Sequence, residues 1–247
     1  EVIKATVRLN FVAEPVDPSD PTSPWLTARP KAIKAIRKVL GKSDYEAHEG
    51  VNSGGANAVY WVDIVLKRPD GLVVVQNITE GAKVKVDEVT ETIEPDLLYP
   101  LLRGRDVQRW RAEPSAYIIV PHTIETRMRP IPMSTMQTRW SKTYGYLKQF
   151  ETVLNQRRGF TGWERQFQQQ AFYAIQRVGT YTFAPWKVVW TRLARIEAAV
   201  VGLHEGKPIV PQETVTLVEC PNANEAHYIC ALVNSSPFQF AAISYSQ

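Results

Sequence analysis

The sequence predicts an α+β fold with mixed, mainly antiparallel sheets and a few packed helices, and two patterns predict it. Short segments rich in Val and Ile and bounded by turn residues are typical of strands, whereas apolar residues at steps of three and four are typical of helices. The two kinds of segment follow one another irregularly, without the alternation of a parallel α/β sheet and without internal repeats. With 247 residues, of which 44% are hydrophobic, the chain can form one large domain or two small ones.

The N-terminal residues differ from the rest in composition. Residues 12–30 contain five prolines and little periodicity, which is typical of a connector. Residues 31–40 place apolar side chains at helical spacing and are followed by Gly41, so they predict a short helix that ends in a glycine cap. We therefore expect residues 1–44 to form a connector with a short helix, and residues 45–247 to form the main domain.

A β-hairpin is predicted near the start of this main domain. Residues 59–66 and 72–78 are rich in Val and Ile, and residues 68–71 between them have the sequence Arg-Pro-Asp-Gly, which favours a tight turn. Residues 117–120 predict another short strand, which Pro121 ends because proline has no N–H to donate to a neighbouring strand.

Two further helices are predicted in the second half of the chain. Residues 141–158 place apolar residues at steps of three and four, with Ser141 as N-cap and Gly159 beyond the end of the helix. Asn222 is followed three residues later by Glu225, which resembles a capping box that opens another helix. The segments that predict strands here are 187–193, 198–203 and 214–219.

Charge is distributed unevenly along the chain. The formal net charge is +4, but residues 97–195 carry 16 basic and 5 acidic residues, a net charge of +11, while the segments before and after are acidic. Of these 16 basic residues 13 are Arg, and aromatic residues are interleaved with them. Arginine binds phosphates and guanine edges through two parallel hydrogen bonds, and aromatic faces pack on sugars or bases. This block is therefore typical of nucleic-acid binding, and the alternative is a solvated basic face over an aromatic core.

Several other classes of protein are disfavoured. No apolar run approaches the roughly 18 residues of a membrane span, and no signal peptide is recognisable, so we expect no membrane partner and a cytoplasmic location. The two cysteines, Cys220 and Cys230, are too few for a disulfide framework, and we interpret them as buried apolar residues. No metal site is expected, because the histidines are scattered without metal-ligand spacing. They are His48, His122, His204 and His227.

A nuclease site is considered and disfavoured. A metal-dependent nuclease needs a Pro-Asp pair followed at a distance by an acidic residue, one spacer residue and a Lys. Asp70 follows a proline, but Glu80 and Lys83 are separated by two residues, which would place them on opposite faces of a strand. The glycine-rich residues 50–57 match neither a phosphate-binding nor a dinucleotide-binding motif. We therefore expect no catalytic residues.

Residues 97–110 have the sequence LLYPLLRGRDVQRW, which resembles a segment of the target-recognition regions of N6-adenine DNA methyltransferases, especially the type IIG and related restriction-modification proteins. Other segments resemble the same regions in the same order, so that the resemblance covers roughly residues 45–240. These segments are residues 45–60, 117–122, 144–158, 181–190 and 225–236.

The resemblance implies a non-catalytic domain that recognises a specific double-stranded DNA sequence. The family's N-P-P-[YF] catalytic motif and its glycine-containing S-adenosylmethionine motif are not in this sequence. The resemblance thus implies that a methyltransferase domain lies upstream of Glu1 in the same chain, is the partner of this domain and binds S-adenosylmethionine, whereas this fragment binds no cofactor. It also implies that the domain continues beyond Gln247. Alternatives are a nuclease domain, a small transferase with an unrecognised site, or a protein-interaction module.

The candidate DNA-contacting residues are mostly the arginines of the basic block. On an extended chain, the four between residues 103 and 111 would share one face. Some of them would instead pair with Asp106 or Glu113, and Arg157 and Arg158 are explained by the dipole at the end of a helix. The full set of candidates is Arg103, Arg105, Arg109, Arg111, Arg127, Arg129, Arg139, Lys142, Asn52 and Asn57.

Overall fold

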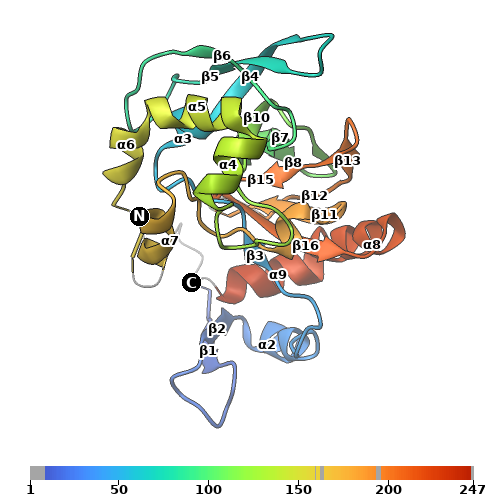
Figure 1. Cartoon of the computed structure of the whole chain (residues 1–247). Helices are drawn as coiled ribbons and strands as arrows, with labels where there is room; N and C mark the ends of the chain where they lie inside the picture. Colours follow the sequence, from blue (N-terminus) through green and yellow to red (C-terminus); the bar gives the residue numbers. More distant parts are fainter. Residues whose placement is uncertain (1–8, 159, 162–163, 193–195, 246–247) are drawn as a thin grey trace, which may run out of the picture. The chain divides into compact units, whose positions relative to one another are not determined.

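The α+β fold is confirmed by a computed structural model of the chain, which describes residues 9–158, 160–161, 164–192 and 196–245 (Figure 1). Contacts divide the chain into two compact units. The terminal unit consists of Glu1–Asp44 with Ala231–Gln247, and the central unit is Tyr45–Cys230. The C-terminal residues thus group with the N-terminal segment and not with the remainder of the expected domain 45–247.

The terminal unit contains more structure than a connector. β1 (Val12–Pro15) pairs antiparallel with β2 (Trp25–Ala28), although the segment is rich in proline. The prolines Pro18, Pro21 and Pro24 lie between the two strands, where no strand N–H is needed. The segment 12–30, which was predicted to be a connector, therefore contains a paired β-hairpin.

The predicted helix of the terminal unit is present but shifted. α2 (Pro30–Arg37) begins with a proline, whose fixed φ suits the first turn, and it ends four residues before Gly41. Its buried Ile33 and Ile36 pack with Leu26 of β2. α9 (Ser236–Tyr245) belongs to the same unit. No helix of the described residues is long and apolar enough to span a membrane.

The central unit is built on a six-stranded sheet. The predicted hairpin is confirmed, since β4 pairs antiparallel with β5 and the turn between them has Gly71 at φ 84°. Only the β15–β7 pair is parallel. The order of the strands is β15 (Val210–Pro211), β7 (Leu98–Leu102), β10 (Ala116–Ile119), β4 (Trp61–Lys67), β5 (Val73–Asn77) and β6 (Thr90–Ile93).

One end of the predicted hairpin is helical. Val59 and Tyr60 belong to α3 (Asn57–Tyr60) and are fully buried, so the prediction that a strand begins at residue 59 is wrong. A short buried apolar run fits a strand and a helical turn equally well by its pattern alone.

A four-stranded antiparallel sheet forms the second half of the central unit. It confirms the strands predicted at residues 187–193, 198–203 and 214–219, of which residue 193 lies outside the described residues. Its order is β12 (Ala198–Val201), β11 (Trp186–Thr191), β16 (Val215–Cys220) and β3 (His48–Glu49). Smaller elements complete it, namely the β8–β9 pair (Val107–Gln108, Arg111–Ala112), the β13–β14 pair (Leu203–His204, Lys207–Pro208), and the 3-10 helices η1 (Gly104–Asp106) and η2 (Thr180–Phe183).

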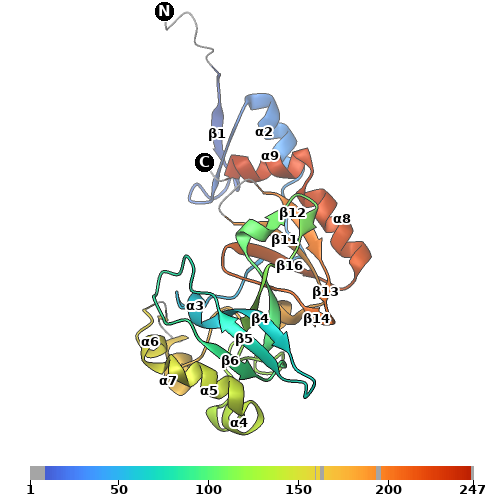
Figure 2. The same cartoon turned by 90° about the horizontal axis from the view of Figure 1, so that it is seen from above.

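Helices cover the six-stranded sheet on one side. Figure 2 shows α4 (Met133–Arg139), α5 (Ser141–Gln149), α6 (Glu151–Asn155) and α7 (Glu164–Gln170) on one side of β4 to β6, and the four-stranded sheet on the other. The predicted helix 141–158 is divided into α5 and α6, because the backbone leaves the helical conformation at Phe150. Gly159 lies outside the described residues.

The N-cap predicted for α5 is wrong. Trp140 occupies the cap position, and Glu94 caps the helix from outside: its carboxylate accepts hydrogen bonds from the backbone N–H groups of Lys142 (3.0 Å) and Thr143 (2.8 Å). Burial raises the pKa of Glu94, but the hydrogen bonds from Thr143 and Lys142 outweigh it and hold that pKa below its usual value. At the start of α8 (Ala223–Val233), by contrast, Asn222 accepts the N–H of Glu225 at 3.0 Å, as predicted.

Candidate nucleic-acid interface

The structure distributes the predicted residues over several parts of the central unit. The arginines of residues 103–111 lie on a segment that we call the basic hairpin, which consists of η1, β8 and β9. Arg127 and Arg129 lie in the loop that follows β10, and Arg139 and Lys142 lie at the junction of α4 and α5. The loop after β10 packs beside α7. Figure 1 shows that α7 is well separated from β8 of the basic hairpin.

The basic hairpin does not present four arginines on one face, so that prediction is wrong. Residues 104–106 form a 3-10 turn, because the carboxylate of Asp106 accepts the backbone N–H of Arg103 at 2.8 Å. Gly104 is required in this turn, since a Cβ atom there would lie 2.7 Å from the hydroxyl of Thr214. The turn changes the direction of the chain between Arg103 and the next arginine.

Arg103 is buried and belongs to the core. Its side chain is 9% exposed, its Nε atom lies 3.4 Å from Asp106, and its Nη2 atom donates to the hydroxyl of Ser115 at 2.5 Å. The guanidinium also lies 5.8 Å from the centre of the Trp61 ring. This side chain fixes the base of the basic hairpin and has no surface to offer a ligand.

The other arginines of the hairpin face solvent. Arg105 is 72% exposed, and its Nε atom is 3.9 Å from Asp106. Arg111 forms two hydrogen bonds with Glu113, at 3.1 and 3.0 Å. The predicted pairing of some arginines with Asp106 or Glu113 is thus confirmed, for Arg103 with Asp106 and for Arg111 with Glu113. Within the described part of the chain, the exposed Arg109 has no ion pair or hydrogen bond through its side chain.

The tip of the basic hairpin holds Arg109, a predicted candidate, and Trp110, which was not among the candidates. β8 ends at Gln108 and β9 begins at Arg111, so Arg109 and Trp110 form a two-residue turn. The Trp110 side chain is 60% exposed. The signal in the sequence was an aromatic residue between two arginines, which was not distinguished from the many buried aromatics around it.

The loop after β10 is held from inside by a histidine. His122 is fully buried: its Nδ1 atom lies 2.8 Å from the carbonyl oxygen of Arg127, and its Nε2 atom accepts the N–H of Ile175 at 3.1 Å. An imidazole that donates through one nitrogen and accepts through the other is neutral. Burial accordingly lowers the pKa of His122 to about 4. The loop thereby exposes the side chains of Arg127 and Arg129.

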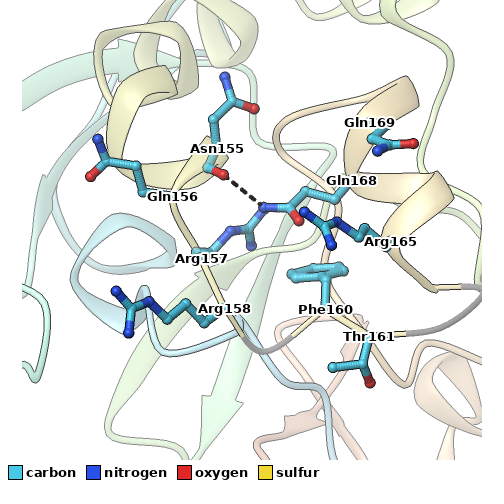
Figure 3. Close-up of a pocket in the computed structure, with 9 residues that line it drawn as sticks. All are labelled: Asn155, Gln156, Arg157, Arg158, Phe160, Thr161, Arg165, Gln168 and Gln169. Atoms are coloured by element: carbon cyan, nitrogen blue, oxygen red, sulfur yellow. Dashed lines mark hydrogen bonds between the residues drawn. The ribbon is translucent and has the colours of Figure 1, made fainter.

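A polar pocket of about 570 Å³ lies between the end of α6 and α7 (Figure 3). Arg158 and Arg165 are exposed at this pocket, and neither forms an ion pair within the described residues. None of the described lining residues is a carboxylate, and apart from Arg157 the remaining polar lining consists of amide and hydroxyl side chains. These residues are Asn155, Gln156, Thr161, Gln168 and Gln169.

Arg157 has a different role from its neighbour. Its guanidinium is buried and donates to the carbonyl oxygens of Leu154 (2.9 Å), Ser53 (2.8 Å) and Phe172 (2.6 Å). Burial is the main influence on this group and lowers the pKa of Arg157. The helix-dipole explanation of Arg157 is therefore replaced by a structural one: the side chain joins three segments of the core.

The remaining candidates have local contacts. Arg139 is exposed and its guanidinium lies 4.6 Å from the centre of the Trp140 ring, while the Lys142 side chain is exposed. Asn52 accepts the N–H of Gly54 at 2.7 Å, and the Oδ1 atom of Asn57 accepts the hydroxyl of Ser53 at 2.5 Å. The two asparagines thus shape the glycine-rich loop.

The structure does not assemble the nuclease residues. Asp70 lies in the β4–β5 turn and pairs with Arg68, whereas Glu80 follows the opposite end of β5, so the two carboxylates cannot share a metal ion. Among the described residues, no three His, Cys, Asp or Glu side chains lie close enough to hold one. Cys220 and Cys230 are both buried, as predicted.

The central unit is thus an α+β body with a basic hairpin and with a second set of exposed arginines near α7, which are Arg127, Arg129, Arg158 and Arg165. No protein-family model matches the chain. It is 28% identical over 146 residues to the Type II methyltransferase M.NspV of Nostoc sp. (strain ATCC 29411 / PCC 7524), a match that covers 58% of this chain and 28% of that protein. The chain therefore spans little more than a quarter of the relative's length, and the similarity supports a methyltransferase-related protein.

Proposed function

We propose that the chain is the part of an adenine-N6 DNA methyltransferase, or of a fused restriction-modification enzyme, that recognises a specific double-stranded DNA sequence. One observation carries the proposal: among the described residues of the basic block 97–195, a set of exposed cations has no close acidic partner. They are Arg109, Arg127, Arg129, Arg139, Lys142, Arg158 and Arg165, together with Arg105, whose nearest carboxylate is 3.9 Å away.

The other described cations of the basic block are already neutralised or buried. Arg177 and Arg192 both pair with Glu49, and Lys148 pairs with Glu151. The cations that remain lie on the basic hairpin, in the loop after β10, at the α4–α5 junction and at the pocket beside α7. Phosphate is the counter-ion that exposed arginines bind most readily. The similarity to a Type II methyltransferase supports DNA as the source of that phosphate.

The basic hairpin is the element best suited to enter a groove. The major groove of B-DNA admits a two-stranded β-ribbon, and arginine at the tip of such a ribbon can reach the O6 and N7 atoms of guanine. Arg109 lies at this tip. In this proposal the loop arginines Arg127 and Arg129 bind phosphates and set the register, while the hairpin reads bases.

A methyltransferase extrudes its target base, so contacts around the target must locate the site. The S-adenosylmethionine and the catalytic residues would lie in another part of a longer protein. The chain described here would therefore bind DNA without transferring a methyl group.

Titration of a fluorescent 30-base-pair duplex with the chain tests the proposal. We expect a Kd of roughly 10⁻⁴ to 10⁻⁶ M at physiological salt, which is the range of non-specific binding dominated by phosphate contacts. In the longer protein, Arg109→Ala should relax the choice of base at one position by about 1 to 3 kcal/mol, measured as methylation of single-base variants of the target. Absence of DNA binding would reject the proposal.

A further inference from the structure

Trp110 is the most exposed tryptophan among the described residues, and it lies at the tip of the basic hairpin. Its indole ring forms no ring contact and its Nε1 atom no hydrogen bond within the described part of the chain. Single exposed apolar residues are common, but a tryptophan with most of its surface in water gains little from folding. Neither packing nor solubility therefore explains this side chain.

The backbone at Trp110 adds a second, independent observation. Its φ angle is 70°, in the left-handed region that side chains other than glycine and asparagine rarely adopt. The N–H of Trp110 donates to the carbonyl oxygen of Ala198 in β12 at 2.9 Å, which holds the turn in this conformation. A bulky residue in such a conformation costs stability, and residues of this kind concentrate at binding sites.

The neighbours of Trp110 indicate what the ring contacts. Arg109 and Arg111 flank it in the chain, and Arg105 on the same hairpin is 72% exposed, so the ring is presented among cations. Cations favour a polyanion over an ordinary protein surface as the partner. An indole face with arginines beside it matches a nucleobase next to its phosphates, because every base offers a flat face for stacking.

We propose that Trp110 stacks on a nucleobase of bound DNA at a step where the regular base stacking is interrupted. A base inside a duplex exposes its face only at such a step, for example at a kink or beside an extruded nucleotide. The inference rests on the proposed DNA-binding function and adds to it a contact that is not electrostatic.

The experiment compares a fully paired 30-base-pair duplex with the same duplex carrying one bulged nucleotide, for the wild type and three variants. At the bulge the regular base stacking is already interrupted, so the wild type should bind the bulged duplex at least about fivefold more tightly than the paired duplex. This factor is the lower end of what one base–aromatic stack contributes. Trp110→Phe should keep most of this preference. Trp110→Leu, which is apolar but has no aromatic face, should lose it.

Trp110→Gly is the decisive variant, because glycine suits a φ of 70°. Its melting temperature should equal or exceed that of the wild type, while its preference for the bulged duplex should disappear. A lowered melting temperature would show that the indole is structural and would overturn the inference. Wild-type binding of both duplexes with equal affinity would overturn it too, but would leave DNA binding intact. If neither duplex binds, the proposed function itself fails.

Discussion

The Nδ1 atom of His122 lies 2.8 Å from the carbonyl oxygen of Arg127, so a fully buried imidazole holds the backbone of an exposed arginine. The ring must be neutral to accept the N–H of Ile175 as well. Arg127, with a φ of 51°, is thus kept in the left-handed region from inside the loop.

Acid should therefore destabilise the protein through His122. Its pKa is lowered to about 4 in the folded state, from 6.5 in the unfolded chain, so the unfolded state binds more protons between these values. The free energy of unfolding should decrease by up to about 3 kcal/mol as the pH falls from 6.5 to 4. Urea titrations across this range should show the decrease in the wild type and a smaller one in His122→Asn. If the free energy of unfolding depended on pH equally in the wild type and in His122→Asn, His122 would not be the group responsible.

Arg103 and Arg105 are separated by one residue but should behave differently. Arg103→Ala removes the guanidinium that pairs with the largely buried carboxylate of Asp106, and it should lower the free energy of unfolding by about 3 kcal/mol. Arg105→Ala removes an exposed side chain and should change it by less than about 0.5 kcal/mol. Thermal unfolding of both variants measures the difference, and comparable losses would contradict the burial of Arg103.

Lys187 should make the protein more stable at alkaline pH. The amine is fully buried and donates to the carbonyl oxygen of Ile209 at 2.9 Å, and burial lowers the pKa of Lys187 from 10.5 to about 7. Between these values the unfolded state holds the extra proton, so the free energy of unfolding should rise by roughly 3 kcal/mol from pH 7 to 9.5. Lys187→Met should lack this rise, because methionine has no proton to release. A parallel rise in the variant would refute the assignment.

The isolated chain should transfer no methyl group and cleave no DNA when S-adenosylmethionine or Mg²⁺ is supplied. For methyl transfer, the reason is that the sequence has no N-P-P-[YF] motif; for cleavage, it is the separation of Asp70 from Glu80 along β5. Assays of methyl transfer and of plasmid cleavage measure this. Turnover that accompanied the purified protein and disappeared in Asp70→Ala or Glu80→Ala would restore the nuclease hypothesis.

Local signals in the sequence were sufficient for much of the fold. The turn at residues 68–71 predicted the β4–β5 hairpin, and the spacing of Asn222 and Glu225 predicted the start of α8. The cap of α5 could not be predicted, because Glu94 is 48 residues away from Lys142 in the sequence. Interactions between distant segments do not appear in a local pattern.

The same limit applied to the candidate interface. Arg103 and Arg105 look alike in the sequence, but only the fold brings Ser115 and the Trp61 ring against the Arg103 side chain. The tip residue Trp110 could not be told from buried aromatics such as Tyr146 until the register of β8 and β9 was known. Composition predicted a polyanionic ligand, which stays a prediction, while the exposure of each candidate side chain required the fold.

The salt dependence of DNA binding tests the central claim most directly. The slope of log affinity against log salt concentration should be clearly negative for the wild type, and it should become shallower by about 1 for each arginine that no longer binds a phosphate. Arg105→Gln with Arg109→Gln, and separately Arg127→Gln with Arg129→Gln, should each flatten the slope. Arg68→Gln is the matched control, because Arg68 is exposed but already paired with Asp70, and it should leave the slope unchanged. A salt-independent affinity, or double variants that fold normally and match Arg68→Gln, would contradict the account.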